Sequence, residues 1–139
     1  MLTNPPTRSL MDDPRRLRDM LDRAHELVST HDVSSVVVGL AGFEGDQDFP
    51  DLVDYVVSAL RIDDSVLRLT NERAVVLLAD TDVGKAGEVM ERVMQDYRER
   101  FPSLSHPAVG LGYYELKSTQ DGFAVKDVLP RIFQVPRSH

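Results

Sequence analysis

The sequence contains no cysteine and no tryptophan, and aromatic residues make up only 6% of its 139 residues. Without cysteine, the chain can form no disulfide, no thiolate nucleophile and no cysteine-ligated zinc site. No apolar run approaches the length of a membrane-spanning helix, and the N-terminal residues lack the apolar segment of a signal peptide. We therefore expect a cytoplasmic protein with no membrane partner.

Positive charge is also scarce, since 16 Lys and Arg residues face 23 acidic residues and the net charge is -7. A negative net charge repels nucleic acid, so we expect no nucleic-acid partner. A polyanionic ligand would require a local basic site. The four histidines lack the spacing of metal ligands. We expect neither a metal site nor a cofactor.

Hydrophobic residues make up 42% of the chain, which is enough for one domain with a substantial core. Residues 1–12 are rich in Pro, Thr and Ser and are typical of a flexible lead-in. The domain is predicted to span residues 13–135, followed by a tail at 136–139.

Hydrophobic periodicity predicts alternating helices and strands along this domain. The predicted helices are 13–30, 50–61, 82–100 and 125–133, and the predicted strands are 34–43, 65–69, 74–79 and 107–116. A turn at 70–73 joins the second and third strands. This order predicts an α+β fold with a ferredoxin-like βαββαβ core, an antiparallel sheet and flanking helices on one face. Enzymes and regulators share that fold, so it does not define a function.

The segment DDSVLRLTNERAVVLLADTD, residues 63–82, resembles the central hairpin of GGDEF domains. These domains are diguanylate cyclases, which join two GTP molecules into cyclic di-GMP. The resemblance covers most of the chain, because VVVGLAGF at 36–43 is similar to the first core strand of the family and AVGLGYYEL at 108–116 to a later strand. The stretch between Phe43 and Arg61 is shorter than in the family.

The catalytic signature of the family is missing. The five positions in register with Gly-Gly-Asp-Glu-Phe hold Thr70, Asn71, Glu72, Arg73 and Ala74. The positions of the metal-binding aspartates in the first strand hold Gly39 and Ala41. Phosphoryl transfer of this kind depends on divalent ions that bridge the phosphates. The resemblance therefore implies a domain that is not an active cyclase.

The family's inhibitory site, Arg-x-x-Asp, is retained as Arg61 and Asp64, at the family's spacing from Arg68. Counting from the turn places Arg92 at the position of a second arginine on the long helix. An arginine can donate to a phosphate or to guanine O6 and N7, and a carboxylate can accept from guanine N1 and N2. The resemblance implies that Arg61, Asp64 and Arg92 bind cyclic di-GMP, and that the ligand promotes a homodimer.

Other interpretations remain open. An Arg-x-x-Asp sequence occurs often at solvated helix ends, and Arg92 could instead pair with Glu88 one turn earlier. The main hypothesis is an inactive GGDEF-like domain that acts as a cyclic di-GMP receptor and passes the signal to an unidentified protein partner. The alternative is a protein-interaction module that binds no nucleotide. An active cyclase is disfavoured by Gly39, Ala41 and Arg73.

Overall fold

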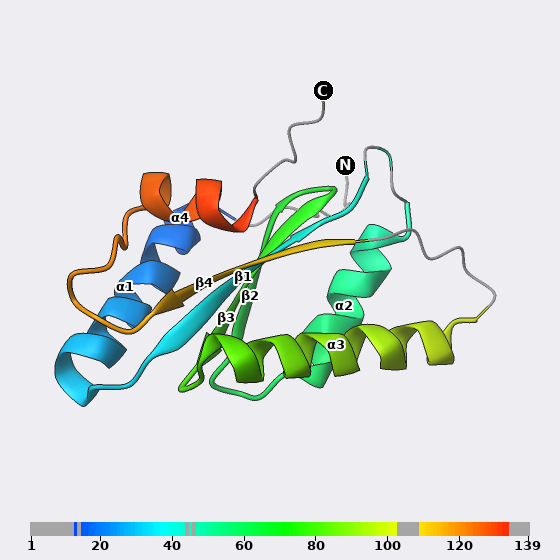
Figure 1. The fold of residues 1–139 in the computed structure, drawn as a ribbon. Coiled ribbons are helices and arrows are strands. Elements are labelled where there is room, and N and C mark those ends of the chain that lie inside the picture. The colour runs from blue at the N-terminus through cyan, green and yellow to red at the C-terminus, as the bar shows by residue number, and fades with distance from the viewer. Residues whose placement is uncertain (1–12, 14, 44, 46, 103–108, 134–139) are drawn as a thin grey trace, which may run out of the picture.

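The computed structural model describes residues 13, 15–43, 45, 47–102 and 109–133 (Figure 1). The elements are α1 (Arg15–His31), β1 (Ser35–Ala41), α2 (Phe49–Ala59), β2 (Ser65–Thr70), β3 (Arg73–Ala79), α3 (Val83–Arg100), β4 (Gly110–Leu116) and α4 (Val125–Ile132). Each predicted helix and strand is confirmed, with ends that shift by a few residues. The predicted lead-in, the tail and the predicted start of the last strand at 107 lie outside the described residues.

The four strands form one antiparallel sheet in the order β2-β3-β1-β4, as expected for a ferredoxin-like core. The central strand β1 pairs with β3 on one side and with β4 on the other. In this register Ala41 lies opposite Arg73, and Gly39 lies opposite Gly112. Residues that the sequence separates by more than thirty positions therefore become neighbours at this end of the sheet.

The two helices of the βαββαβ core lie on one face of the sheet, as expected, and the two helices outside the core cover the other face (Figure 1). Helices α2 and α3 pack on the face that carries Val36, Val38 and Leu40 of β1. Helices α1 and α4 pack on the opposite face, against Val37. The physical reason is the continuous apolar run of β1, which places hydrophobic side chains on both faces and requires cover on each.

Local sequence sets the helix starts and the hairpin. Asp13 accepts a hydrogen bond from the Arg15 amide at 3.0 Å, and Asp82 accepts one from the Lys85 amide at 2.9 Å, as expected of N-terminal caps. The turn between β2 and β3 is shorter than predicted, because Thr70 and Arg73 already pair with each other. A register shift next to Thr70 absorbs the difference.

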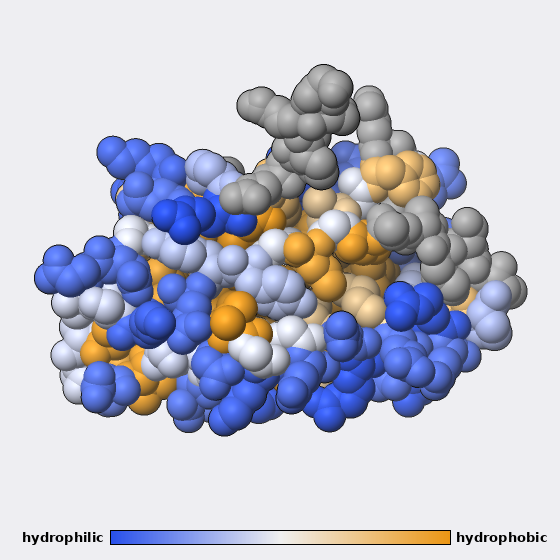
Figure 2. Space-filling view, viewed as in Figure 1, coloured by the Kyte–Doolittle hydropathy of each residue, from blue (hydrophilic) through white to orange (hydrophobic). Residues whose placement is uncertain are grey.

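No helix among the described residues is long and apolar enough to cross a bilayer. The space-filling view shows a mainly hydrophilic surface along the outer side of α3 (Figure 2). The inner side of the same helix carries the buried stripe Ala86, Met90, Val93, Met94 and Tyr97. This is the amphipathic pattern of a helix that covers a sheet.

Candidate functional site

The predicted binding residues Arg61 and Asp64 lie in the connection from α2 to β2, called here the arginine corner (residues 61–64). Helix α2 ends at Ala59, and a turn follows in which the Asp64 amide donates to the Arg61 carbonyl at 3.0 Å. This turn brings the two side chains together. The structure therefore confirms their proximity, while ligand binding by them stays a prediction.

Asp64 is the buried member of the corner, with a side chain that is only 2% exposed. Its Oδ1 accepts from the Ala79 amide at 3.0 Å and from Arg61 Nη2 at 3.1 Å. Its Oδ2 accepts from the backbone amide of Arg61 at 3.1 Å and from Arg61 Nε at 3.2 Å. The carboxylate thus ties the corner to the end of β3 and holds one edge of the guanidinium.

Arg61 is the accessible member, with a side chain that is 59% exposed. Its Nη2 also donates to the Ala79 carbonyl, so Nε and Nη2 are both fixed from the protein side. The hydrogen bond to Asp64 raises the pKa of Arg61 above its ordinary value, against the opposing effect of burial. The result is a permanently charged guanidinium in a fixed orientation, half open to solvent.

The surroundings of the corner are acidic. Asp63 and Asp80 act on Arg61 together with Asp64, so one cation faces three carboxylates. A dianionic ligand approaching Arg61 would meet this repulsion unless a second cation joined the site. Ile62 in the same corner is 98% exposed.

Arg92 lies on the exposed face of α3, away from the core stripe of that helix. It makes no hydrogen bond or ion pair with any residue that the structure describes, so the alternative of a pair with Glu88 is not observed. Arg92 makes no hydrogen bond or ion pair with Arg61 or Asp64 either. Arg92 is therefore available to a partner, and its role in ligand binding stays a prediction.

Arg68, which fixes the register of the corner in the sequence, points to α2. Its Nη2 donates to Oδ1 of Asp54. This contact joins β2 to the helix that precedes the corner. Arg68 therefore supports the position of the corner from the sheet.

The positions that correspond to the family's metal-binding aspartates lie at the end of the sheet opposite the arginine corner. Ala41 of β1 faces Arg73 of β3 across the strand pair, and Gly39 lies two residues before it. The Gly42 amide donates to the Glu72 carbonyl at 2.7 Å, which attaches the hairpin turn to the end of β1. This end of the sheet thus brings together a glycine, an alanine and an arginine where the family resemblance would place metal ligands.

The space above Gly39 is filled by the end of α4. A Cβ atom at Gly39 would lie 2.5 Å from the Ile132 carbonyl oxygen, and one at Gly112 would lie 2.2 Å from it. Both distances are shorter than any real contact, so only glycine at these paired positions lets the helix lie this close. Phe133 directly follows α4, and its ring centroid lies 5.2 Å from the Arg73 guanidinium.

These residues do not fit a magnesium site. Magnesium prefers carboxylate oxygens, and this place offers two residues without polar side chains and a cation. Among the described residues, no group of three or more His, Asp or Glu side chains could hold a metal ion. Sequence reasoning missed the packing role of Gly39 and Gly112. Their identity as glycines was visible, but their pairing under α4 was not.

Known proteins provide a comparison for this fold. No family model and no curated protein matches the sequence. PelD 158-CT from Pseudomonas aeruginosa PAO1 matches with a TM-score of 0.65 and 21% identity over 91% of this chain, which spans only 46% of the PelD chain. The FimX GGDEF domain from Pseudomonas aeruginosa matches with a TM-score of 0.65 and 12% identity, over 88% of each chain. The fold is that of GGDEF domains.

A further GGDEF-fold match was solved with a ligand. The GGDEF domain of DgcB from Caulobacter crescentus, in complex with c-di-GMP, matches with a TM-score of 0.56 and 15% identity. The match covers 82% of this chain and 81% of that domain. At such identities the likeness establishes the fold alone, so activity and ligand have to be argued from the residues of this chain.

Proposed function

We propose that this chain is a catalytically inactive domain with the GGDEF fold that binds cyclic di-GMP at the arginine corner. The observation that carries the proposal is the Arg61 guanidinium, which Asp64 orients and which remains half open to solvent. Because Asp64 and the Ala79 carbonyl occupy Nε and Nη2, the Nη1 group remains to donate to a phosphate oxygen or to guanine O6 or N7. The DgcB complex with c-di-GMP supports this choice of ligand for the fold.

Two features support the absence of cyclase activity. Gly39 and Ala41 supply no carboxylate, and the Ile132 carbonyl occupies the space in which a side chain at position 39 would lie. Incubation with GTP and magnesium is expected to give no cyclic di-GMP. Any dinucleotide product, detected by chromatography, would overturn this part of the proposal.

In the proposed complex Arg61 contacts the ligand, and Asp64 acts as a positioning residue. Both carboxylate oxygens of Asp64 already accept hydrogen bonds within the corner. The sequence predicts that Asp64 also recognises guanine directly. That contact requires Asp64 to lose one of its hydrogen bonds to Arg61. An Asp64→Asn variant is therefore expected to weaken binding mainly by loosening Arg61.

Ligand binding is expected to need a second copy of the chain. The acidic corner offers one cation to a dianionic ligand, whereas Arg92 on the exposed face of α3 has no partner among the described residues. Arg92 of one copy and Arg61 of another would together neutralise the two phosphates. Sedimentation is expected to show a larger dimer fraction with cyclic di-GMP for the native chain than for Arg92→Ala. Arg98→Ala, which removes an exposed arginine from the same helix, is the matched control.

Calorimetric titration with cyclic di-GMP tests the proposal. The native chain is expected to bind, and Arg61→Ala is expected to weaken binding by about tenfold or more, the effect of losing charge-assisted hydrogen bonds. Arg61→Lys keeps the charge but loses the planar fork, so it should restore only part of the affinity. If Arg61→Ala bound cyclic di-GMP as tightly as the native chain, the arginine corner would not be the binding site.

A second function is favoured by a specific observation, which is the fully exposed Ile62 beside the acidic groups of the corner. A protein partner with an apolar pocket and basic rim would cover this surface without any nucleotide. SiaD from Pseudomonas aeruginosa, another GGDEF-fold match with 22% identity, was solved in complex with its activator SiaC. The absence of cyclic di-GMP binding, together with binding to a protein partner that Ile62→Ser abolishes, would favour this second function.

A further inference from the structure

Strand β4 forms one outer edge of the sheet, and among the described residues no strand lies beyond it. In Figure 1 this edge lies at the front, between α4 and α3. The same region of Figure 2 is less hydrophilic than the surface below it, along α3. The edge of a sheet presents unpaired amide and carbonyl groups to any extended chain that can pair with it.

The register shows which backbone groups of β4 point outward. The Gly42 amide donates to the Glu72 carbonyl at 2.7 Å, so the even-numbered residues of β1 form their backbone hydrogen bonds with β3. Bonding directions alternate along an antiparallel strand, so the odd-numbered residues of β1 bond to β4. Their partners in β4 are Gly110, Gly112, Tyr114 and Leu116. The amides and carbonyls that point away from the sheet are those of Leu111, Tyr113 and Glu115.

This edge lacks the protection that the other edge of the sheet has. The amides and carbonyls that point outward from β4 form no hydrogen bond with any residue that the structure describes. The opposite edge strand, β2, has a register shift beside Thr70 and carries the charged Arg68. Strand β4 pairs with β1 over its whole length without a shift, and it contains no proline, lysine or arginine. Because bulges, prolines and charges are what prevent pairing at an edge, β4 is the edge suited to another chain.

Helix α3 borders the β4 edge and leaves room beside it. The Val83 amide donates to Oε1 of Glu115 at 3.3 Å, which places the start of α3 next to the end of β4. Gly87 lies one turn further on the same side of the helix, and a Cβ atom there would meet nothing within 4 Å. Glycine is unfavourable inside a helix, and no packing contact requires it at this position. A helix without a side chain at this point leaves space for an added strand.

The charge beside this part of the edge is negative. Burial, followed by the charge of Glu91, raises the pKa of Tyr113, so Glu91 lies near the outward-facing part of β4. Glu91 is exposed and makes no hydrogen bond or ion pair with any described residue. The whole chain carries a net charge of -7. A second copy would bring another acidic chain to this edge, whereas a basic segment complements it.

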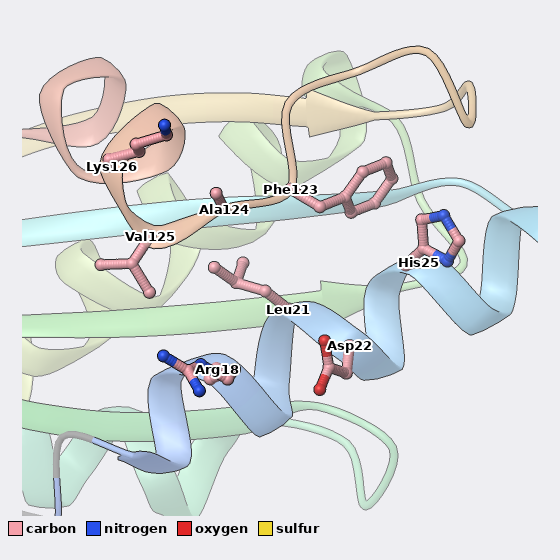
Figure 3. A pocket seen from close by; sticks show the side chains of 8 residues that line it. All are labelled: Arg18, Leu21, Asp22, His25, Phe123, Ala124, Val125 and Lys126. Atoms are coloured by element: carbon pink, nitrogen blue, oxygen red, sulfur yellow. The ribbon is translucent and has the colours of Figure 1, made fainter.

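Contacts on the other face hold β4 in place without a partner. The Tyr114 hydroxyl accepts from the Gly122 amide at 3.1 Å, and the Arg131 guanidinium lies 5.2 Å from the centroid of the Tyr114 ring. The loop after β4 runs back to Phe123, which lies beside His25 of α1 (Figure 3). The rings of Phe123 and His25 meet edge to face, with centroids 4.8 Å apart. The edge is therefore formed in advance.

We propose that the β4 edge binds an extended segment of a protein partner, which joins the four-stranded sheet as an additional strand and places a basic side chain next to Glu91. The backbone groups of Leu111, Tyr113 and Glu115 supply the hydrogen bonds. Residues with β-branched side chains suit the segment, because it has to be extended. This surface lies at the opposite edge of the sheet from β2 and the arginine corner, and it needs no nucleotide.

Hydrogen exchange of the full chain, followed by NMR, provides the test. The probe is a synthetic peptide of alternating lysine and valine with seven residues, the length of β4. In the free chain the amides of Leu111, Tyr113 and Glu115 are expected to exchange faster than the β4 amides that bond to β1. The peptide is expected to slow these three amides by about tenfold near saturation. Binding by charge alone would not produce this alternating pattern.

Matched controls separate strand pairing from attraction by charge. A peptide with methyl groups on its internal amides keeps its charge but cannot donate, so it is expected to bind about tenfold or more weakly. Gly87→Gln is expected to favour the helix and still weaken binding, because its side chain enters the space of the added strand. Glu91→Gln is also expected to weaken binding. Asp96→Asn, which removes an exposed acid from the other side of α3, is its control and is expected to change binding less.

The proposal is overturned if the peptide binds without slowing the three outward amides, or if the methylated peptide binds as tightly as the unmodified one. It is also overturned if these amides are already protected in the free chain, and protection that rises with protein concentration would identify a second copy as the occupant. Equal binding by Gly87→Gln and the native chain would contradict the proposed position of the segment. Arg61→Ala is expected to leave peptide binding unchanged, whether or not it affects cyclic di-GMP.

Discussion

Asp64 is predicted to stabilise the fold more than any other residue of the arginine corner. Replacing Asp64 by Ala removes the acceptor of the Ala79 amide, which lies at the end of β3. It also removes the acceptor of the Arg61 amide and both contacts to the guanidinium. The substitution therefore acts on buried backbone groups as well as on an ion pair.

The magnitude follows from burial. Ala79 is buried, so its unpaired amide would cost about 1 to 3 kcal/mol. The Arg61 guanidinium is 59% exposed, and water replaces most of what it loses, so the ion pair contributes less than about 1 kcal/mol. Together, Asp64→Ala is expected to lower the free energy of unfolding by about 2 to 3 kcal/mol. Arg61→Ala should lower it by less than about 1 kcal/mol.

Urea unfolding followed by far-UV circular dichroism measures both effects, since the chain has no tryptophan for fluorescence. Asp63→Ala is the matched control, because Asp63 is an exposed acid in the same corner, and its substitution should change stability by less than about 0.5 kcal/mol. The reasoning is refuted if Asp64→Ala is no more destabilising than Asp63→Ala, or if Arg61→Ala costs as much as Asp64→Ala.

Two further predictions concern the sheet. Gly39→Ala is expected to lower the free energy of unfolding by about 1 to 3 kcal/mol, because its Cβ would press on the Ile132 carbonyl; a neutral result would show that α4 does not lie there. Burial, followed by the nearby charge of Glu91, raises the pKa of Tyr113 above its ordinary value of 10.0. The neutral phenol is therefore favoured in the folded state, and its contribution to stability is present below about pH 10 and lost as pH rises through the folded pKa. Tyr113→Phe should lose less stability than the native chain when the urea midpoint is measured above pH 10, and equal losses would contradict this assignment.

Periodicity predicted the elements because their apolar spacing is regular. The stripe of α3 and the β-branched run of β1 both repeat with the period of their own element. The sequence did not show which helices cover each face of the sheet. The run Val36 to Leu40 indicates burial on both faces, but it does not say which helices provide the cover.

The candidate site was predictable in part. The spacing from Arg61 to Arg68 identified the corner and placed Asp64 beside Arg61. The burial of Asp64 was not predictable, because its partner Ala79 lies fifteen residues further along the chain. The packing of α1 against α4 was also not predictable, because residues far apart in the sequence come together there to line one groove.

The most direct test of the central claim is the NMR signal of the Arg61 Nε–H group during titration with cyclic di-GMP. The signal is identified by its loss in Arg61→Lys. The account predicts that it shifts and saturates together with the ligand-bound amides of residues 61–64. An unmoved Arg61 Nε–H signal in the presence of saturating cyclic di-GMP would contradict it.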